Sequence, residues 1–167
     1  ASKPHSQLMK PKVHSLIAVA SPLIVALTVA PVHAAPLYWD VSAANNLTAG
    51  NGTWGTDAFW ATSTTPLLAA PGAWTDGNDA FFQTAGANVV GIAAGGVSAT
   101  SVTQTTSGTV TTLSSGGGTL NLTGSGSIVN SGNQTFTINA PINLNGAGTY
   151  NFQSTSTITI GGGIGET

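Results

Sequence analysis

Residues 119–164 read TLNLTGSGSIVNSGNQTFTINAPINLNGAGTYNFQSTSTITIGGGI, and this stretch decides the fold class because apolar and polar residues alternate in it. The alternation is clearest in residues 119–122, 135–138, 149–152 and 157–160, and Gly, Ser and Asn are frequent between these runs. A period of two with β-branched residues is typical of half-buried strands, and the intervening residue types favour turns. Because no segment after Ala35 has the period of a helix, the sequence predicts an all-β fold.

The same stretch contains an internal repeat of 22 residues. A shift by this period aligns eight identical pairs: Asn121/Asn143, Leu122/Leu144, Gly124/Gly146, Gly126/Gly148, Thr135/Thr157, Thr137/Thr159, Ile138/Ile160 and Ile142/Ile164. Conservative pairs lie between them, namely Leu120/Ile142, Ile128/Tyr150 and Phe136/Ile158. Self-similarity at this period indicates a stacked repeat, and the pattern and helical half of a leucine-rich repeat are missing. We therefore predict a parallel β-helix, or β-solenoid, whose coils have about 22 residues.

Each coil is expected to hold three short strands, near residues 119–122, 127–130 and 135–138 and, one coil later, near 141–144, 149–152 and 157–160. The alternation predicts that one set of side chains points into the coil: Leu120, Leu122, Phe136 and Ile138. It predicts that a second set points outward: Asn121, Thr135 and Thr137. Stacking then produces apolar ladders inside and Thr or Asn ladders outside. We expect positive φ at the corner glycines 124, 126, 146 and 148, and we place Asn130 at a corner. A weaker coil with a longer spacing, roughly 26 residues, is visible in residues 97–103 and 109–113.

The segment before the repeat is rich in aromatic residues and includes all four tryptophans, Trp39, Trp54, Trp60 and Trp74. One interpretation is a sugar-binding face, because aromatic rings stack on sugars. The other is a cap, because the end of a solenoid exposes strand edges that large aromatic side chains cover efficiently. We favour the cap. We assign residues 35–94 to an aromatic N-terminal cap and residues 95–167 to solenoid coils that we expect to be truncated at the C-terminus.

Residues 1–34 resemble a secretory signal peptide. Lys10 and Lys12 precede a mostly apolar run over residues 16–30, and a small-residue cleavage pattern ends at Ala34–Ala35. A transmembrane helix is the rival interpretation, but the run is shorter than the roughly 20 residues that span a bilayer, and it contains Pro22. We predict a helical signal peptide over residues 1–34, with residues 1–8 as an upstream extension before Met9. The chain is therefore expected to be exported.

Charged residues are scarce, and their positions exclude many functions. The three lysines and three histidines all lie before Ala34, and the chain has no Arg or Cys. After Ala35 there is consequently no Ser-His or Cys-His pair, no His or Cys ligand for zinc, and no cation to neutralise nucleic-acid phosphates. The ionisable groups that remain are Asp40, Asp57, Asp76, Asp79, Glu166 and two tyrosines. We expect no catalysis, no cofactor and no nucleic-acid partner.

Asp76, Asn78 and Asp79 form the densest cluster of oxygen ligands. Hard cations such as Ca²⁺ prefer oxygen, so these residues are a weak calcium candidate, although their spacing matches no calcium-binding loop. The alternative is a turn before a strand over residues 80–82, because Asp and Asn satisfy their own backbone in turns. Asp76 and Asp79 could also act as the carboxylate pair of a glycoside hydrolase. The absence of Arg, Lys and His after Ala35 argues against that activity.

The order of the motifs resembles a known family. The residues that carry the resemblance are Tyr38-Trp39-Asp40, Asn51-Gly52-Thr53-Trp54, Phe59-Trp60, Pro71, residues 76–82 (DGNDAFF), residues 97–103 (VSATSVT) and residues 118–122 (GTLNL). This pattern, over residues 37–164, is similar to the N-terminal part of bacterial autotransporter-associated β-strand repeat proteins. The resemblance implies a large secreted or surface-displayed chain with a parallel β-helical passenger region. The K-x-G-x-G-x-L and N-x-Y-x-G elements of that family do not occur here.

These observations favour a structural function. We expect a secreted or surface-displayed passenger or stalk segment of an autotransporter-like protein, exported to the bacterial outer surface. Any contact with the outer membrane would then involve parts beyond this fragment. A glycan-binding adhesin module that uses the four tryptophans to contact surface glycans is the first alternative. The second is a self-assembling surface filament, because unpaired solenoid ends can pair between chains.

Overall fold

The computed structural model describes residues 34–44, 46–65 and 70–167, which belong to the second of two compact units of the chain. The predicted signal peptide, apart from Ala34, lies outside the described residues. Within the described residues the chain forms thirteen strands and no helix. The strands are β1 Pro36–Trp39, β2 Gly52–Trp54, β3 Trp60–Ala61, β4 Asn78–Phe82, β5 Gly86–Ile92, β6 Val97–Gln104, β7 Thr109–Ser115, β8 Leu120–Asn130, β9 Phe136–Ile138, β10 Ile142–Asn145, β11 Asn151–Ser154, β12 Ile158–Ile160 and β13 Ile164–Glu166.

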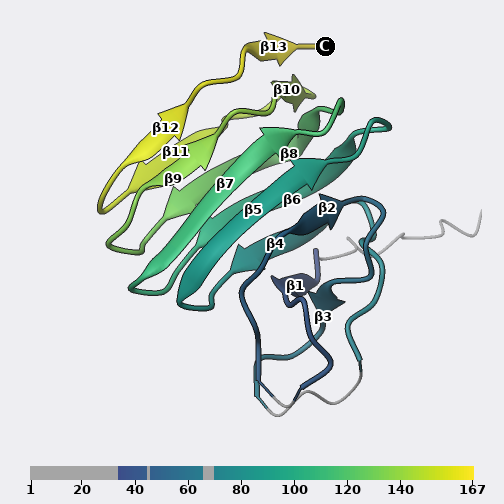
Figure 1. Cartoon of the computed structure of the whole chain (residues 1–167). Helices are drawn as coiled ribbons and strands as arrows, with labels where there is room; N and C mark the ends of the chain where they lie inside the picture. The colour runs from purple at the N-terminus through teal and green to yellow at the C-terminus, as the bar shows by residue number, and fades with distance from the viewer. Residues whose placement is uncertain (1–33, 45, 66–69) are drawn as a thin grey trace, which may run out of the picture. The chain divides into compact units, whose positions relative to one another are not determined.

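The strands form two sheets that face each other (Figure 1). The first sheet has the order β13-β10-β8-β6-β4-β1-β3, and β11 also pairs with β8. The second sheet has the order β12-β9-β7-β5-β2. All strand pairs are parallel except β1 and β3, which are antiparallel. From β4 to β10 successive strands alternate between the sheets. The chain winds through about four turns of a β-solenoid with coils of about 23 residues. No helix of the described residues is long and apolar enough to cross a membrane.

The predicted 22-residue register is confirmed in the last two coils. Leu120 pairs with Ile142, and Ile142 pairs with Ile164. In the second sheet Phe136 pairs with Ile158, and the neighbouring pair joins Thr137 and Thr159. Directly paired residues of a parallel ladder share a face, so the periodicity correctly identifies both the faces and the neighbours.

One part of the register was predicted wrongly. Ile128 pairs with Phe152, not with Tyr150, because two extra residues separate β10 from β11 compared with the previous coil. The turn between β11 and β12 is shorter by the same amount, so the 22-residue spacing returns at Phe136 and Ile158. The two strands predicted near 119–122 and 127–130 are also one continuous strand, β8.

The earlier coils are longer and begin before the predicted boundary. Val97 pairs with Leu120 at the start of β6. The register shifts between Ala99 and Ser101, so pairs beyond this point, such as Val102 with Ile128, have a larger separation in the sequence. This agrees with the longer spacing expected for this coil. The ladders do not start at residue 95, because β4 and β5 already pair with β6 and β7. Part of the segment assigned to a cap is therefore solenoid.

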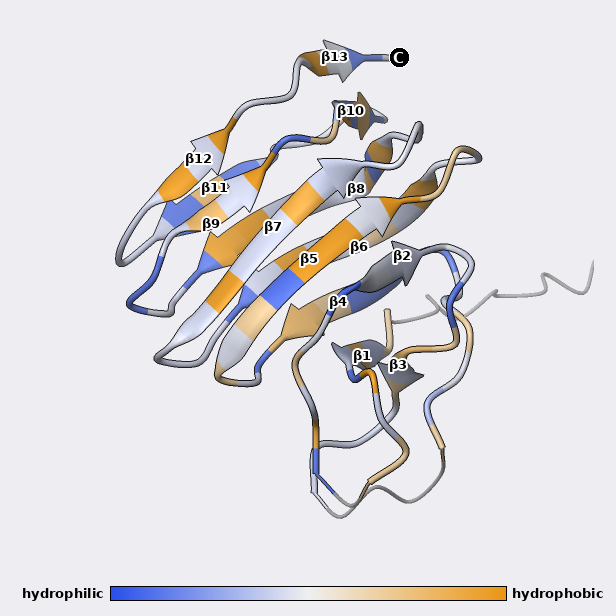
Figure 2. Cartoon of the chain, in the orientation of Figure 1, coloured by the Kyte–Doolittle hydropathy of each residue, from blue (hydrophilic) through white to orange (hydrophobic). Residues whose placement is uncertain are grey.

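The core lies between the two sheets, and strand residues alternate between core and surface as predicted (Figure 2). Leu120, Leu122, Phe136 and Ile138 are fully buried. The outer positions, such as Asn121 and Thr137, are half-buried. The stack thus has an apolar interior and a surface of Thr, Asn and Ser with few charges.

The glycines of the corners differ in what they contribute. Gly124 and Gly146 have φ values of +66° and +118°, as predicted. Gly126 and Gly148 do not have positive φ, so that part of the prediction is wrong. A Cβ on Gly148 would lie 2.6 Å from the carbonyl oxygen of Gly124. Its small size, not its backbone freedom, is what this position requires.

Candidate functional site

The tryptophans of the front segment form a buried cluster and not an open face. Trp39, Trp54 and Trp60 are at most 1% exposed. The Trp54 and Trp60 ring centroids are 4.9 Å apart, and Phe82 packs against all three tryptophans. No ring face of Trp39, Trp54 or Trp60 is open to a sugar, which contradicts a glycan contact by these residues.

Trp74 is the half-buried member of the cluster. Its ring centroid lies 4.6 Å from that of Trp60 and 4.8 Å from that of Trp54. Its indole Nε1 donates to Asp76 Oδ1 at 2.9 Å and to the Ser98 carbonyl oxygen at 3.2 Å. These bonds fix the ring against β6, so its contacts bind the aromatic segment to the solenoid.

The side-chain oxygens of Asp76, Asn78 and Asp79 each accept a hydrogen bond from a different donor. Asp76 Oδ1 accepts from the Ser98 backbone nitrogen at 2.8 Å, and Asn78 Oδ1 accepts from the Ala35 nitrogen at 2.9 Å. Asp79 Oδ1 accepts from the Ser101 hydroxyl at 2.6 Å. Residues 76 and 77 form a turn, and β4 starts at residue 78, as the turn interpretation predicted. The described residues contain no group of three His, Cys, Asp or Glu arranged for a metal ion.

Two further aspartates hold turns of the front segment. Asp57 Oδ2 accepts from the Thr53 backbone nitrogen at 2.7 Å. Asp40 is completely buried, and its Oδ1 accepts from the nitrogens of Ser42 at 3.1 Å and Thr48 at 2.9 Å. Asp40 Oδ2 is buried without a hydrogen-bond partner. The carboxylates at residues 40, 57, 76 and 79 thus stabilise backbone turns and connections between coils.

A buried polar network lies at the corner between β8 and β9. Gln104 Oε1 accepts from the Thr111 nitrogen at 2.9 Å, and Gln104 Nε2 donates to Asn130 Oδ1 at 3.1 Å. Asn130 Nδ2 donates to the carbonyl oxygens of Gln134 and Thr157, both at 2.8 Å. The corner position predicted for Asn130 is therefore correct. The role of Gln104 was missed, because no repeat of this residue type appears in the 22-residue alignment.

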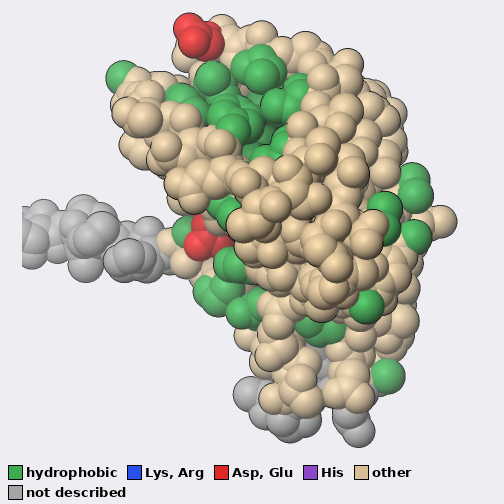
Figure 3. All heavy atoms as spheres, turned by 90° about the vertical axis from the view of Figure 1, so that its left-hand side faces the viewer, with side chains coloured by type: hydrophobic (Ala, Val, Ile, Leu, Met, Phe, Trp, Pro, Cys, Tyr) green, Lys and Arg blue, Asp and Glu red, His purple; other side chains and the backbone are tan. Residues whose placement is uncertain are grey.

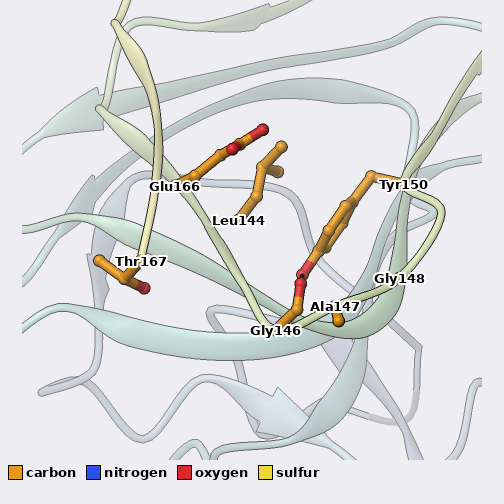
Figure 4. A pocket seen from close by; sticks show the side chains of 7 residues that line it. All are labelled: Leu144, Gly146, Ala147, Gly148, Tyr150, Glu166 and Thr167. Atoms are coloured by element: carbon orange, nitrogen blue, oxygen red, sulfur yellow. Dashed lines mark hydrogen bonds between the residues drawn. The ribbon is translucent and has the colours of Figure 1, made fainter.

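The upper end of the stack is hollow, and hydrophobic side chains lie in the hollow (Figure 3). A cavity of about 470 Å³ there is lined by Leu144, Gly146, Ala147, Gly148, Tyr150, Glu166 and Thr167 (Figure 4). Glu166 pairs with Leu144, which pairs with Leu122, so this carboxylate stands at a core-facing position of the ladder. The Tyr150 hydroxyl donates to the Gly146 carbonyl oxygen at 3.1 Å. The sequence pattern did not single out Glu166, because residues 165–167 show no alternation.

Comparison with known proteins adds no identification. No protein-family model matches the chain, and neither a curated protein nor a solved structure does. The resemblance to autotransporter-associated repeat proteins therefore stays a prediction from the sequence.

Proposed function

We propose that this chain is a structural passenger or stalk segment of a secreted, autotransporter-like protein, displayed on the bacterial outer surface and without catalysis. The observation that carries the proposal is the unbroken pair of parallel ladders, which extends the molecule by repetition. A parallel solenoid grows by about 4.8 Å for each coil that it adds. A rigid, elongated solenoid keeps the segments at its two ends at a fixed distance, which is the mechanical task of a stalk.

The use of the charged groups supports this proposal. Asp76 and Asp79 connect β6 to the preceding turn and strand through Ser98 and Ser101. Asp40 and Asp57 close turns in the front segment. Each of these carboxylates contributes to the scaffold, and a chain with so few charges has little else with which to perform acid–base chemistry.

We also propose that the aromatic segment acts as a cap for the N-terminal end of the solenoid. Trp39, Trp54 and Trp60 are packed on Phe82 of β4, and Phe82 also contacts Phe136 at a centroid distance of 6.4 Å. The aromatic cluster is thus continuous with the apolar core of the coils. Large rings at a solenoid end cover apolar surface that would otherwise face water.

Duplication of one coil tests the stalk function. A second copy of residues 120–141 inserted after Pro141 preserves the register, because Leu120 of the copy takes the place of Ile142 above the original Leu120. The variant should fold and lengthen the distance between labels at residues 38 and 159 by about one strand spacing, ~4.8 Å. A copy of residues 131–141 alone breaks the register and should destabilise the fold. Equal stability of the two insertions, or no increase in length for the full coil, would contradict the proposal.

Self-association through the C-terminal end is the second candidate function. Phe152 and Ile164 are 40% and 51% exposed, although their partners one coil below, Ile128 and Ile142, are buried. Glu166 opposes such stacking, because residues 35–167 provide no cation to pair with a buried carboxylate. If this end joins copies, Glu166→Leu should increase oligomer formation, as measured by light scattering over a range of concentrations. A monomer for both the wild type and Glu166→Leu would rule this function out.

A further inference from the structure

We propose that Asn145 is a site of spontaneous deamidation, in which the backbone nitrogen of Gly146 attacks the side-chain amide of Asn145. The chain contains two Asn-Gly pairs, Asn51-Gly52 and Asn145-Gly146. Glycine favours this reaction because it has no Cβ to hinder the approach of its nitrogen to the neighbouring amide. The two pairs therefore share the same local chemistry, and only the surrounding structure distinguishes them.

The reaction needs water and no other reactant. The Gly146 nitrogen forms a bond to Asn145 Cγ, the bond from Cγ to Nδ2 breaks, and the displaced nitrogen leaves as ammonia with the proton of the attacking amide. The resulting cyclic imide then takes up one water molecule. Opening of the bond between Cγ and the Gly146 nitrogen gives aspartate. Opening of the bond between the Asn145 carbonyl carbon and the same nitrogen gives isoaspartate, in which the main chain runs through Cγ.

The structure restrains the second pair less than the first: Asn145 pairs with Thr123 at the end of β10, and the Gly146 carbonyl oxygen accepts from the Tyr150 hydroxyl, but neither contact holds the Asn145 side chain. Asn145 is the exposed last residue of β10, and Gly146 is exposed just beyond the strand with φ +118°. Among the described residues no hydrogen bond engages the Asn145 side chain. The residues that follow, Ala147 and Gly148, are also exposed. A turn of this kind opens at low cost, because few contacts have to be broken.

The structure restrains the first pair. Asn51 is exposed as well, but its Oδ1 accepts a hydrogen bond from the Val89 nitrogen at 3.0 Å. Gly52 lies in β2 and pairs with Val90 in the parallel ladder. The attack requires both the side chain and the strand to move out of these contacts. We therefore expect Asn145 to react at least about tenfold faster than Asn51 in the folded protein.

The modification would change the surroundings of the cavity described above. A new carboxylate at residue 145 lies next to Leu144 and Gly146, which line the cavity together with Glu166. No cation after Ala35 compensates for this second negative charge. In the isoaspartyl form the chain also gains a main-chain carbon directly after Leu144, so the pairing of Asn145 with Thr123 would be lost.

Peptide mapping by mass spectrometry tests the proposal. The purified chain is incubated in water enriched in heavy oxygen, at mildly acidic and mildly alkaline pH, and also in denaturant. In the folded chain we expect labelled aspartate and isoaspartate to form at residue 145 at least about ten times faster than at residue 51, at a rate that rises with pH. In denaturant the two sites should react at similar rates. The variant Asn145→Gln, whose longer side chain forms the ring far more slowly, should lose the signal at that position only.

Three results would overturn the proposal. The first is an equal rate at the two Asn-Gly pairs in the folded chain. The second is faster conversion at Asn51. The third is an unmodified Asn145 in the folded chain under conditions in which the denatured chain is converted.

Discussion

The inner and outer faces of the coils are decided residue by residue. Phe136 is fully buried and pairs with Ile158, whereas its neighbour Thr137 lies on the outer face beside Thr159. A charge placed at residue 136 would be buried in a chain that has no cation after Ala35. The same charge at residue 137 would remain in contact with water. These two adjacent positions therefore form a matched pair.

We expect Phe136→Asp to lower the free energy of unfolding by about 3–5 kcal/mol, since an unpaired buried charge costs that much. Thr137→Asp should cost less than about 1 kcal/mol, as is usual for surface substitutions. Denaturant unfolding followed by circular dichroism measures both values. Equal losses would show that the faces are assigned wrongly.

Some tight connections between strands leave no space for a side chain. Gly118 precedes β8 and is buried, and a Cβ at this position would collide with the Ala93 carbonyl oxygen of the coil below. Gly163 precedes β13, and a Cβ there would meet no atom within 4 Å. A Cβ on Gly162, one residue earlier, would collide with the Ala140 carbonyl oxygen, so the stacking of corners explains why glycine is needed at residues 118 and 162 and not at residue 163.

We predict that Gly118→Ala destabilises the protein by about 1–3 kcal/mol, the usual cost of overpacking. Gly163→Ala should change the stability by less than about 1 kcal/mol in either direction. Thermal unfolding of the two variants provides the comparison. A loss for Gly163→Ala as large as that for Gly118→Ala would contradict the corner packing described here.

At the scale of elements, the sequence predicted the strands better than the turns between them. Alternation is repeated in every strand of a coil, so Leu120, Phe136 and their partners could be assigned from the pattern alone. The number of residues in a turn leaves no such periodic signal, which is why Tyr150 was aligned with Ile128 in place of Phe152. A compensating change in the next turn hid the error from the 22-residue alignment.

The candidate sites were less predictable than the strands, because they depend on contacts between distant residues. Nothing in the local sequence around Trp39, Trp54 and Trp60 distinguishes rings that face water from rings that pack on Phe82. The same is true of Gln104, whose partners Thr111, Asn130 and Gln134 come from other strands and turns. Burial and long-range hydrogen bonds are properties of the folded chain, and a single sequence does not display them.

At the scale of the whole molecule, export is the first step of the proposed function. When residues 1–167 are expressed in a Gram-negative host, we expect cleavage between Ala34 and Ala35, so that the mature N-terminus reads Ala-Pro-Leu-Tyr. N-terminal sequencing of the exported protein measures this directly. Intact chain in the membrane fraction would instead support a membrane anchor.

A pair of introduced cysteines tests the coil register most directly. Thr137 and Thr159 pair on the outer face, and the natural chain has no cysteine that could interfere. Adjacent parallel strands lie about 4.8 Å apart, within the range that a disulfide bridges. Under mild oxidation at low protein concentration, Thr137→Cys with Thr159→Cys should form an intramolecular disulfide, as shown by non-reducing mass spectrometry. The matched pair Thr137→Cys with Asn143→Cys, whose second member belongs to the other sheet, should not. Disulfide formation in the second pair and not in the first would contradict the solenoid.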